Sequence, residues 1–295
     1  TYILYYAKDI GNLKVNHLYD ELKIGEAGAT RYLICQDQFG RVRRLTENEQ
    51  ENAGQISPEW RPFFKQGITS RSGGDRTQRP VTHCGSVYVP TTGGWRTGES
   101  GMNRLHKASR LTIEGNRLAF KRFFDDFTAT PVNNIWDDIS GGIKSRSDPK
   151  IYAVQTSATV VERCMLMSTS PGDLVLDPTC GSGTTAFVAE KWGRRWITCD
   201  TSRVAVTLAK QRLMTASYDY YELKYPHEGL KGGFIYKTVP HVTLKSIANN
   251  PEIDEIHERL HPAIEDALSL LNETLKKHLP NVPFVVTEGA RKGQE

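Results

Sequence analysis

Residues 174–185 decide the fold class of this chain, and they read Leu174-Val-Leu-Asp-Pro-Thr-Cys-Gly-Ser-Gly-Thr-Thr185. A short apolar run ends at Asp177, and two glycines then precede a stretch typical of a helix. Gly181 and Gly183 allow backbone conformations that other residues avoid, and they allow close approach to a ligand. The stretch therefore predicts a strand, a glycine-rich loop and a helix N-terminus that can together form a ligand site.

The elements around this stretch alternate between helix and strand. In chain order, the sequence predicts a helix over 157–168, a strand over 174–176, a helix over 184–192, a strand over 196–199 and a helix over 203–215. Such alternation is typical of a parallel sheet covered by helices. The fold class expected is therefore α/β.

Two acidic residues, Asp177 and Asp200, end two of the predicted strands. The carboxyl ends of parallel strands meet at one edge of a sheet, where open α/β sheets bind ligands, and Asp200 could accept hydrogen bonds from a ribose. Gly181-x-Gly183-x-x-Ala186 also fits the dinucleotide fingerprint. A carboxylate at Asp177 would repel a pyrophosphate but would suit a ligand that carries an ammonium and a sulfonium. The sequence thus favours S-adenosylmethionine over a nicotinamide dinucleotide.

Positive charge is concentrated in one part of the chain. The net charge is only +4, yet residues 61–122 contain twelve Lys/Arg and three Asp/Glu. Glycines interrupt this segment, which indicates loops rather than one charged helix face. A solvated basic surface would explain the pattern, but the local excess beside Trp95 favours contact with nucleic acid.

The composition excludes other classes of protein. Hydrophobic residues make up 38% and charged residues 24% of the 295 residues, and no apolar run is long enough to span a bilayer. The five cysteines are scattered without a C-x-x-C pair, which argues against a disulfide framework and favours a reducing cytoplasm. His83 and Cys84 are adjacent but lack a second pair of ligands, so no metal site is expected.

The motif at 174–185 resembles the donor-binding motif of amino-directed DNA methyltransferases, which modify adenine N6 or cytosine N4. Residues 196–205 resemble the strand, acid and helix that follow in that family, and residues 152–163 are similar to its preceding segment. The resemblance implies a Rossmann-like methyltransferase fold with S-adenosylmethionine as cofactor. The residues that would bind it are Asp177, Pro178, Cys180, Gly181, Ser182, Gly183, Thr184, Asp200 and Gln155.

The N-terminal residues 1–8 resemble a catalytic-domain strand of the permuted members of that family, such as the modification subunits of type III restriction–modification systems. This resemblance implies double-stranded DNA as a partner, with a restriction subunit or a homodimer as further possibilities. It also implies four regions: the end of the catalytic half (1–19), an inserted target-recognition region of mixed structure (20–150), the S-adenosylmethionine-binding half (151–225) and a C-terminal helical extension (226–295).

Within the target-recognition region, arginines in glycine-rich surroundings are the candidates for DNA contact. They are Arg71, Arg76, Arg79, Arg96 and Arg104. Trp95 could stack on a base, although a buried structural role explains it equally well.

The family's catalytic Asp/Asn/Ser-Pro-Pro-Tyr/Phe motif has no counterpart, because the chain contains no Pro-Pro pair. In the permuted order this motif precedes the strand at which the chain begins, so we expect a fragment of a methyltransferase that is inactive alone. No catalytic residue is therefore assigned. The alternatives are a nucleic-acid-binding module without a working donor site, a small-molecule methyltransferase and a Rossmann oxidoreductase.

Overall fold

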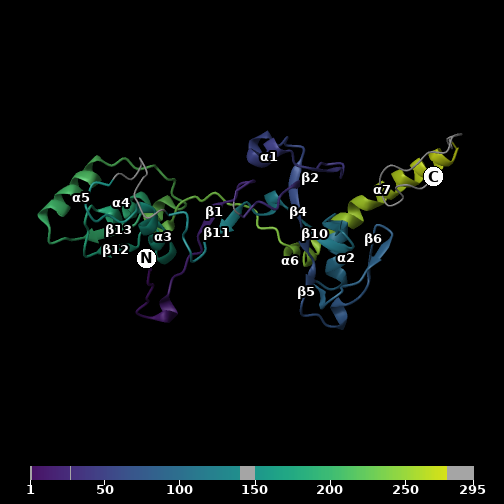
Figure 1. The fold of residues 1–295 in the computed structure, drawn as a ribbon, viewed down its shortest axis with the longest axis horizontal. Helices are drawn as coiled ribbons and strands as arrows, with labels where there is room; N and C mark the ends of the chain where they lie inside the picture. The colour runs from purple at the N-terminus through teal and green to yellow at the C-terminus, as the bar shows by residue number, and fades with distance from the viewer. Residues whose placement is uncertain (1, 27, 140–149, 278–295) are drawn as a thin grey trace. The chain divides into compact units, whose positions relative to one another are not determined.

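The computed structural model describes residues 2–26, 28–139 and 150–277 of the chain. The chain divides into two compact units, each made of two stretches of sequence (Figure 1). Unit 1 comprises residues 1–21 and 129–238, and unit 2 comprises residues 22–128 and 239–295. The assignment of separate roles to four regions of the sequence stays a prediction.

Unit 1 contains the predicted alternation of helices and strands. Its elements are η1 (Ile10–Asn12), β1 (Tyr19–Glu21), β11 (Ala129–Pro131), α3 (Ala158–Ser168), β12 (Leu174–Asp177), α4 (Thr184–Lys191), β13 (Arg195–Thr198), α5 (Arg203–Thr215) and η5 (Pro226–Gly232). β12 and β13 pair in parallel, with Val175 opposite Trp196, and β1 pairs antiparallel with β11. The five elements expected between residues 157 and 215 are all present, so the α/β class is confirmed.

The two faces of the β12–β13 pair differ in burial. Successive side chains of a strand point to opposite faces. Val175 packs towards a buried cluster that contains Met165 of α3 and Val188 of α4. Its neighbours Leu174 and Leu176 point the other way and are exposed by 53% and 65%. The helices described in unit 1 therefore bury one apolar face of this sheet and leave the other exposed.

The strand that the resemblance implied at residues 1–8 is wrong for residues 2–8, which the structure describes. These residues form no strand, and Tyr2, Leu4 and Tyr6 are exposed by 96%, 74% and 82%. A β-strand is stabilised by hydrogen bonds to a neighbouring strand, and no described residue offers such a partner to this segment. The resemblance of this segment to a strand of the permuted methyltransferases therefore did not predict its conformation.

Unit 2 is built on a five-stranded antiparallel sheet with the order β3-β2-β4-β10-β9. Its strands are β2 (Ile34–Gln36), β3 (Val42–Arg44), β4 (Arg61–Gly67), β9 (Leu111–Glu114) and β10 (Arg117–Phe123). Two smaller pairs are β5 (Thr69–Ser70) with β8 (Gly94–Trp95) and β6 (Val81–His83) with β7 (Ser86–Tyr88). The helices are α1 (Glu47–Glu51), α2 (Glu99–Lys107), α6 (Leu244–Ala248) and α7 (Glu252–Lys277), with 3-10 turns η2 (Ala53–Gln55), η3 (Asp75–Thr77) and η4 (Phe124–Asp126).

The main core of unit 2 joins segments that are far apart in the sequence. Side chains from the sheet, α2 and α6 form one buried cluster, namely Ile68, Trp95, Met102, Leu105, Leu111, Leu118, Phe120, Ile247 and Ala248. The indole of Trp95 is 5% exposed and donates to the Arg79 carbonyl over 2.8 Å. The apolar ring of Trp95 is packed in the core, and its N–H group is hydrogen-bonded within the same unit. Trp95 therefore has a structural role.

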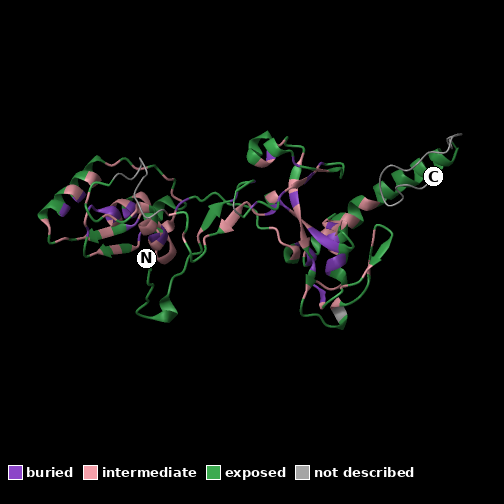
Figure 2. Ribbon diagram, in the orientation of Figure 1, coloured by how far each residue is buried: buried purple, intermediate pink, exposed green. Residues whose placement is uncertain are grey.

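Helix α7 lies within the segment 226–295, for which a helical extension was expected. Its first turn is fixed to α2, because Asp254 accepts hydrogen bonds from Arg104 over 2.8 Å and from Lys107 over 2.7 Å. Further along, its apolar stripe is open to solvent, as Leu260 and Leu275 are 54% and 53% exposed (Figure 2). Within the part of the chain that is described, no helix is long and apolar enough to cross a membrane.

A buried ion pair closes the end of the central sheet in unit 2. Arg110 donates to both oxygens of Asp126 over 2.6 and 2.9 Å, and the Phe123 N–H donates to the same carboxylate over 2.9 Å. Asp126 is only 2% exposed. The adjacent Asp125 also pairs with an arginine, Arg61, but both of these side chains are at least half exposed.

These neighbouring aspartates give a matched test. We expect Asp126→Asn to lower the free energy of unfolding by about 3 kcal/mol, because it leaves the buried Arg110 charge uncompensated. Asp125→Asn removes a solvent-screened pair and should cost less than about 1 kcal/mol. Urea unfolding of both variants measures the difference, and equal losses would contradict the buried role of Asp126.

Candidate functional site

The glycine-rich loop, residues 178–183, connects the end of β12 to the start of α4. Two hydrogen bonds fasten it to the chain that follows β13. The Cys180 N–H donates to the Cys199 carbonyl over 2.9 Å, and the Gly181 N–H donates to Asp200 Oδ2 over 2.9 Å. The two strand ends that the sequence analysis paired are thus brought together at one edge of the sheet.

Both glycines of the loop have the left-handed conformation that favours glycine. Gly181 has a φ of 51° and Gly183 has a φ of 76°. A Cβ on Gly183 would lie 2.8 Å from the Ala209 Cβ, so this glycine also allows α4 and α5 to pack closely. A Cβ on Gly181 would lie 3.7 Å from the Tyr152 ring and 3.8 Å from the Val154 carbonyl oxygen, which are ordinary contacts.

Asp200 holds the loop in place through both carboxylate oxygens. Oδ1 accepts the Ser202 N–H over 2.8 Å, and Oδ2 accepts the Gly181 N–H. These backbone donors lower the pKa of the Asp200 carboxyl below its usual value. The structure therefore gives Asp200 a positioning role that the sequence analysis did not foresee, while its contact with a ribose stays a prediction.

Asp177 lies at the end of β12 and is less engaged than Asp200. Its Oδ1 accepts the Thr179 N–H over 3.0 Å, and no described residue donates to its Oδ2. The backbone carbonyl of Asp177 accepts from Thr198 Oγ1 and from the Cys199 N–H, each over 3.1 Å. This half-exposed carboxylate is thus held firmly by its backbone and can accept further hydrogen bonds from a ligand.

The remaining hydroxyl groups predicted to bind the donor point into the protein. Ser182 and Thr184 are 2% and 6% exposed, and their hydroxyl oxygens lie 3.2 Å apart. Arg212 donates to Thr184 Oγ1 over 3.1 Å, and its guanidinium lies 4.7 Å from the ring of Phe187. Arg212 was missed from sequence, although its spacing from Ala205 and Ala209 places it on the buried face of α5.

The other predicted donor residues surround the loop. Pro178 is exposed, and its carbonyl accepts from Cys199 Sγ over 3.6 Å. Gln155 Oε1 accepts the Ile151 N–H over 3.0 Å, which shapes the segment whose Tyr152 ring contacts the loop at Gly181. The structure therefore places the segment around Gln155 beside the glycine-rich loop. The sequence showed only that this segment precedes the loop in the chain.

A cavity of about 500 Å³ borders the loop on the side of α5. It is lined by Cys180, by residues of β13 and by the apolar face of α5, including Val206 and Leu213. The Tyr218 hydroxyl is buried there without a hydrogen-bond partner among the described residues, and burial raises its pKa. Cys180 thus connects the loop to an apolar cavity that the sequence analysis did not anticipate.

The arginines proposed for DNA contact all belong to unit 2, but they differ in exposure and in the ion pairs and hydrogen bonds that they form. Arg71 is exposed, and Arg79 forms an exposed ion pair with Glu99. Arg104 donates to the Ala248 carbonyl over 3.1 Å and forms an ion pair with Asp254 of α7. Arg96 is exposed and borders a cavity. The side chain of Arg76 lies outside the described parts.

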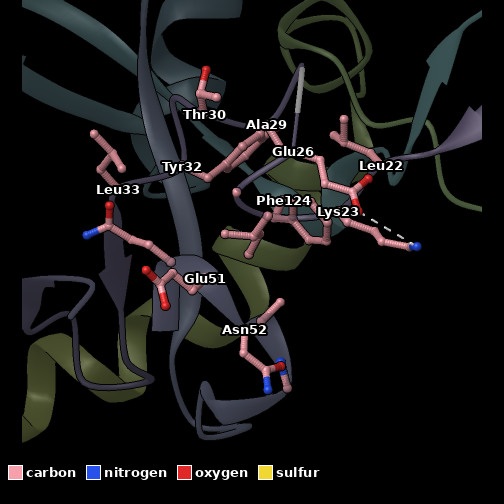
Figure 3. Close-up of a pocket in the computed structure, with 15 residues that line it drawn as sticks. Leu22, Lys23, Glu26, Ala29, Thr30, Tyr32, Leu33, Glu51, Asn52 and Phe124 are labelled. Atoms are coloured by element: carbon pink, nitrogen blue, oxygen red, sulfur yellow. Dashed lines mark hydrogen bonds and ion pairs between the residues drawn. The ribbon is translucent and has the colours of Figure 1, made fainter. Parts of the chain in front are cut away.

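A separate cavity of about 810 Å³ lies in unit 2 between the 22–33 segment and the 50–54 segment (Figure 3). The labelled residues include Lys23 and Glu26, whose Nζ and Oε1 atoms lie 3.9 Å apart. They also include the aromatic residues Tyr32 and Phe124. Because its charges are of both signs and its floor is part of a hydrophobic cluster, it does not single out one class of ligand.

Residues 105–211 match the model of the N6/N4 DNA methylase family, which is described as DNA methylase. This range includes β12, the loop, α4, β13 and Asp200. Residues 105–211, here called the methylase segment, are therefore similar to the N6/N4 DNA methylases. The match supports the amino-directed DNA methyltransferase family that the motif at 174–185 indicated.

Curated relatives of the methylase segment are type II methyltransferases. The chain is 42% identical over 62 residues to M2.DpnII of Streptococcus pneumoniae, which is 21% of this chain and 23% of that protein. It is 40% identical over 84 residues to M2.LlaDCHI of Lactococcus lactis subsp. cremoris (28% and 30%) and 35% identical over 88 residues to M.BamHI of Bacillus amyloliquefaciens (30% and 20%). The chain therefore spans 20 to 30% of the length of these relatives.

Solved structures with similar segments include methylases that carry a ligand. One is M1.HpyAVI in complex with SAM, at 31% identity over 25% of this chain and 36% of that one, with a TM-score of 0.23. Another is TTHA0409 of Thermus thermophilus, a putative DNA modification methylase complexed with S-adenosyl-L-methionine, at 24% identity over 61% and 66%, also with a TM-score of 0.23. These scores are too low for an argument from superposition.

We expect substitution of the two loop glycines to lower the free energy of unfolding by different amounts. Gly183→Ala should lower the free energy of unfolding by about 2–4 kcal/mol, because it adds both backbone strain and a clash with α5. Gly181→Ala should cost only about 1–2 kcal/mol, since it adds backbone strain alone. Thermal unfolding of both variants compares them, and an equal or greater loss for Gly181→Ala would contradict the packing assigned to Gly183.

Proposed function

We propose that this protein is the donor-binding and target-recognising part of a DNA amino-methyltransferase, with S-adenosylmethionine as donor and adenine N6 as the favoured target. The observation that carries the proposal is the loop 178–183, which Asp200 fastens to the end of β13 inside the segment of the methylase family. The match of this segment to that family supports the choice of donor. The preference for adenine rests on the resemblance to type III modification subunits.

The residues at the loop fit a cationic donor better than a diphosphate. Asp177 presents a firmly held carboxylate with one oxygen that receives no hydrogen bond from a described residue. This oxygen can accept from an ammonium, whereas it would repel a phosphate. Asp200, Gly181 and Gly183 would shape the backbone against the nucleoside, and Pro178, Cys180 and Gln155 would border it. When bound, the donor supplies an electrophilic methyl group on a sulfonium.

Transfer of that methyl group requires residues that this sequence does not contain. The exocyclic amine of adenine is a poor nucleophile because its lone pair is conjugated with the ring. As the N–C bond forms and the S–C bond breaks, the amine must lose a proton to an acceptor. The family uses its Pro-Pro motif for this purpose, and the chain has no Pro-Pro pair. We therefore propose that this chain binds the donor and DNA but does not transfer methyl groups alone.

Unit 2 would recognise double-stranded DNA in this proposal. Arg71 and Arg96 are the favoured contacts of the original set, since both are exposed and belong to none of the ion pairs between described residues. Arg79 could exchange Glu99 for a phosphate, whereas Arg104 is held between α2 and α7. A restriction subunit or a second copy as partner belongs to the same proposal.

Donor binding gives the first test of the proposal. Calorimetry should detect binding of S-adenosylhomocysteine but not of a nicotinamide dinucleotide. Asp177→Asn should weaken the binding about tenfold, because it removes one charge-assisted contact worth about 1.5 kcal/mol. Asp219→Asn, an exposed acid of the same unit, serves as the control and should leave the affinity unchanged. Binding of the dinucleotide alone would overturn the proposal, and failure to bind either ligand would favour the DNA-binding module.

Methyl transfer gives the second test. The isolated chain, incubated with DNA and radiolabelled S-adenosylmethionine, should incorporate no label above background, because no residue pattern for activating the amine is present. A complete methyltransferase of the same family provides the positive control. Robust incorporation by this chain would show that other residues activate the amine.

A further inference from the structure

A second cavity of unit 2, also of about 810 Å³, has the composition of an anion site. It lies where β4 and β10 meet the 95–98 loop and the 241–249 segment. Its lining includes Ser70, Ser72, Arg96, Thr97, Arg122 and Lys245. Its size is within the range of small-molecule sites in proteins, about 300–1,000 Å³.

The charge of this cavity is of one sign. It contains Arg96, Arg122 and Lys245, and none of the described residues that line it is acidic. None of these three cations takes part in an ion pair with a described residue, in contrast to Arg79 and Arg104 close by. Positive groups gathered in a concave site without counter-charges raise the local concentration of anions.

Arg122 adds a donor that lacks a partner within the described parts of the chain. Its Nε is buried and forms no hydrogen bond with any described residue. The guanidinium lies 5.9 Å from the ring of Phe64 and is a neighbour of Tyr32. Leaving a buried donor unsatisfied is costly, and such groups are generally paired with protein, water or ligand. An oxyanion in the cavity would supply the missing acceptor.

The remaining lining favours a phosphodiester over a base. Hydroxyl groups of serines and threonines surround the cations, and such groups typically bind phosphate oxygens of DNA. Two of the aromatic residues in the lining, Trp95 and Phe120, are only 5% and 1% exposed and belong to the core, so their faces are covered. The third ring, His241, is exposed but packs against the ring of Phe127 at 4.3 Å. The cavity thus offers mainly charge and hydrogen-bond donors.

We propose that this cavity binds a backbone phosphate of the DNA and so fixes the position of unit 2 on the duplex. This inference rests on the proposed function, since it names where that DNA is held. Arg122 and Lys245 join Arg96 in this role, and neither stood out in the sequence. Arg122 follows a run of core residues in β10, and Lys245 lies well beyond the basic segment 61–122.

The anion itself provides the first experiment. Inorganic phosphate is titrated into the ¹⁵N-labelled protein, and the backbone amide signals of Ser70, Thr97 and Thr243 are followed by NMR. We expect saturable shifts at these three residues, weakened at least several-fold in Arg122→Lys, which retains the charge but removes the Nε fork. Shifts that are absent, or equally strong in the variant, would overturn the anion site whether or not the protein binds DNA.

The salt dependence of DNA binding provides the second experiment. Each phosphate contact contributes about −0.9 to the slope of log K against log salt concentration. Because the cavity would hold one phosphate, the Arg96→Ala/Lys245→Ala double variant should reduce the magnitude of the slope by about 1. The control, Arg44→Ala/Arg117→Ala, removes the same charge from exposed strand positions of unit 2 outside this cavity.

The two ways of failing are distinct. An unchanged slope in the cavity variant, or an equal change in the control, would overturn the phosphate contact while leaving the proposed function intact. A wild-type protein that binds no DNA at low salt would overturn DNA recognition by unit 2, and the phosphate titration would then decide on the anion site alone.

Discussion

The hydrogen bond from the Gly181 N–H to Asp200 is the constraint on which the geometry of the glycine-rich loop depends. The bond joins a loop that leaves one strand to an acid that ends the next strand, over 2.9 Å. A loop with two left-handed glycines has many conformations available when it is free. The carboxylate of Asp200 selects one of them, and the contact of Gly183 with α5 excludes others. The site is therefore formed by the sheet as much as by the motif.

The part of the fold that could be predicted is the part with local signals. Between residues 157 and 215, apolar runs, glycines and turns alternate at short range, and every expected element is present. The same reasoning placed Asp177 and Asp200 at neighbouring strand ends. It could not assign their roles, because a carboxylate that binds a ribose and one that holds a loop give the same sequence pattern. Only the N–H groups around Asp200 distinguish them.

The elements that sequence reasoning missed depend on distant partners. Residues 2–8 have the composition of a strand, but no described segment pairs with them. The sheet of unit 2 was not predicted because its order, β3-β2-β4-β10-β9, joins two local hairpins, β2–β3 and β9–β10, through β4 across long intervening segments. Trp95 presents a similar difficulty, since a stacking tryptophan and a buried one differ only in what surrounds them. Its surroundings come from α2 and α6.

The basic segment 61–122 illustrates why a count of charges is an incomplete guide to DNA binding. Its local excess of positive charge is partly neutralised by acids outside the segment, as Asp126 pairs with Arg110 and Asp254 pairs with Arg104. An arginine in such a pair is committed to the fold, because releasing it would leave a partly buried carboxylate without its partner. Arginines that have no counter-charge among the described residues, such as Arg122, remain able to bind an external anion. The pairing of charges in the folded chain, rather than their number in the sequence, therefore decides which basic residues can act on DNA.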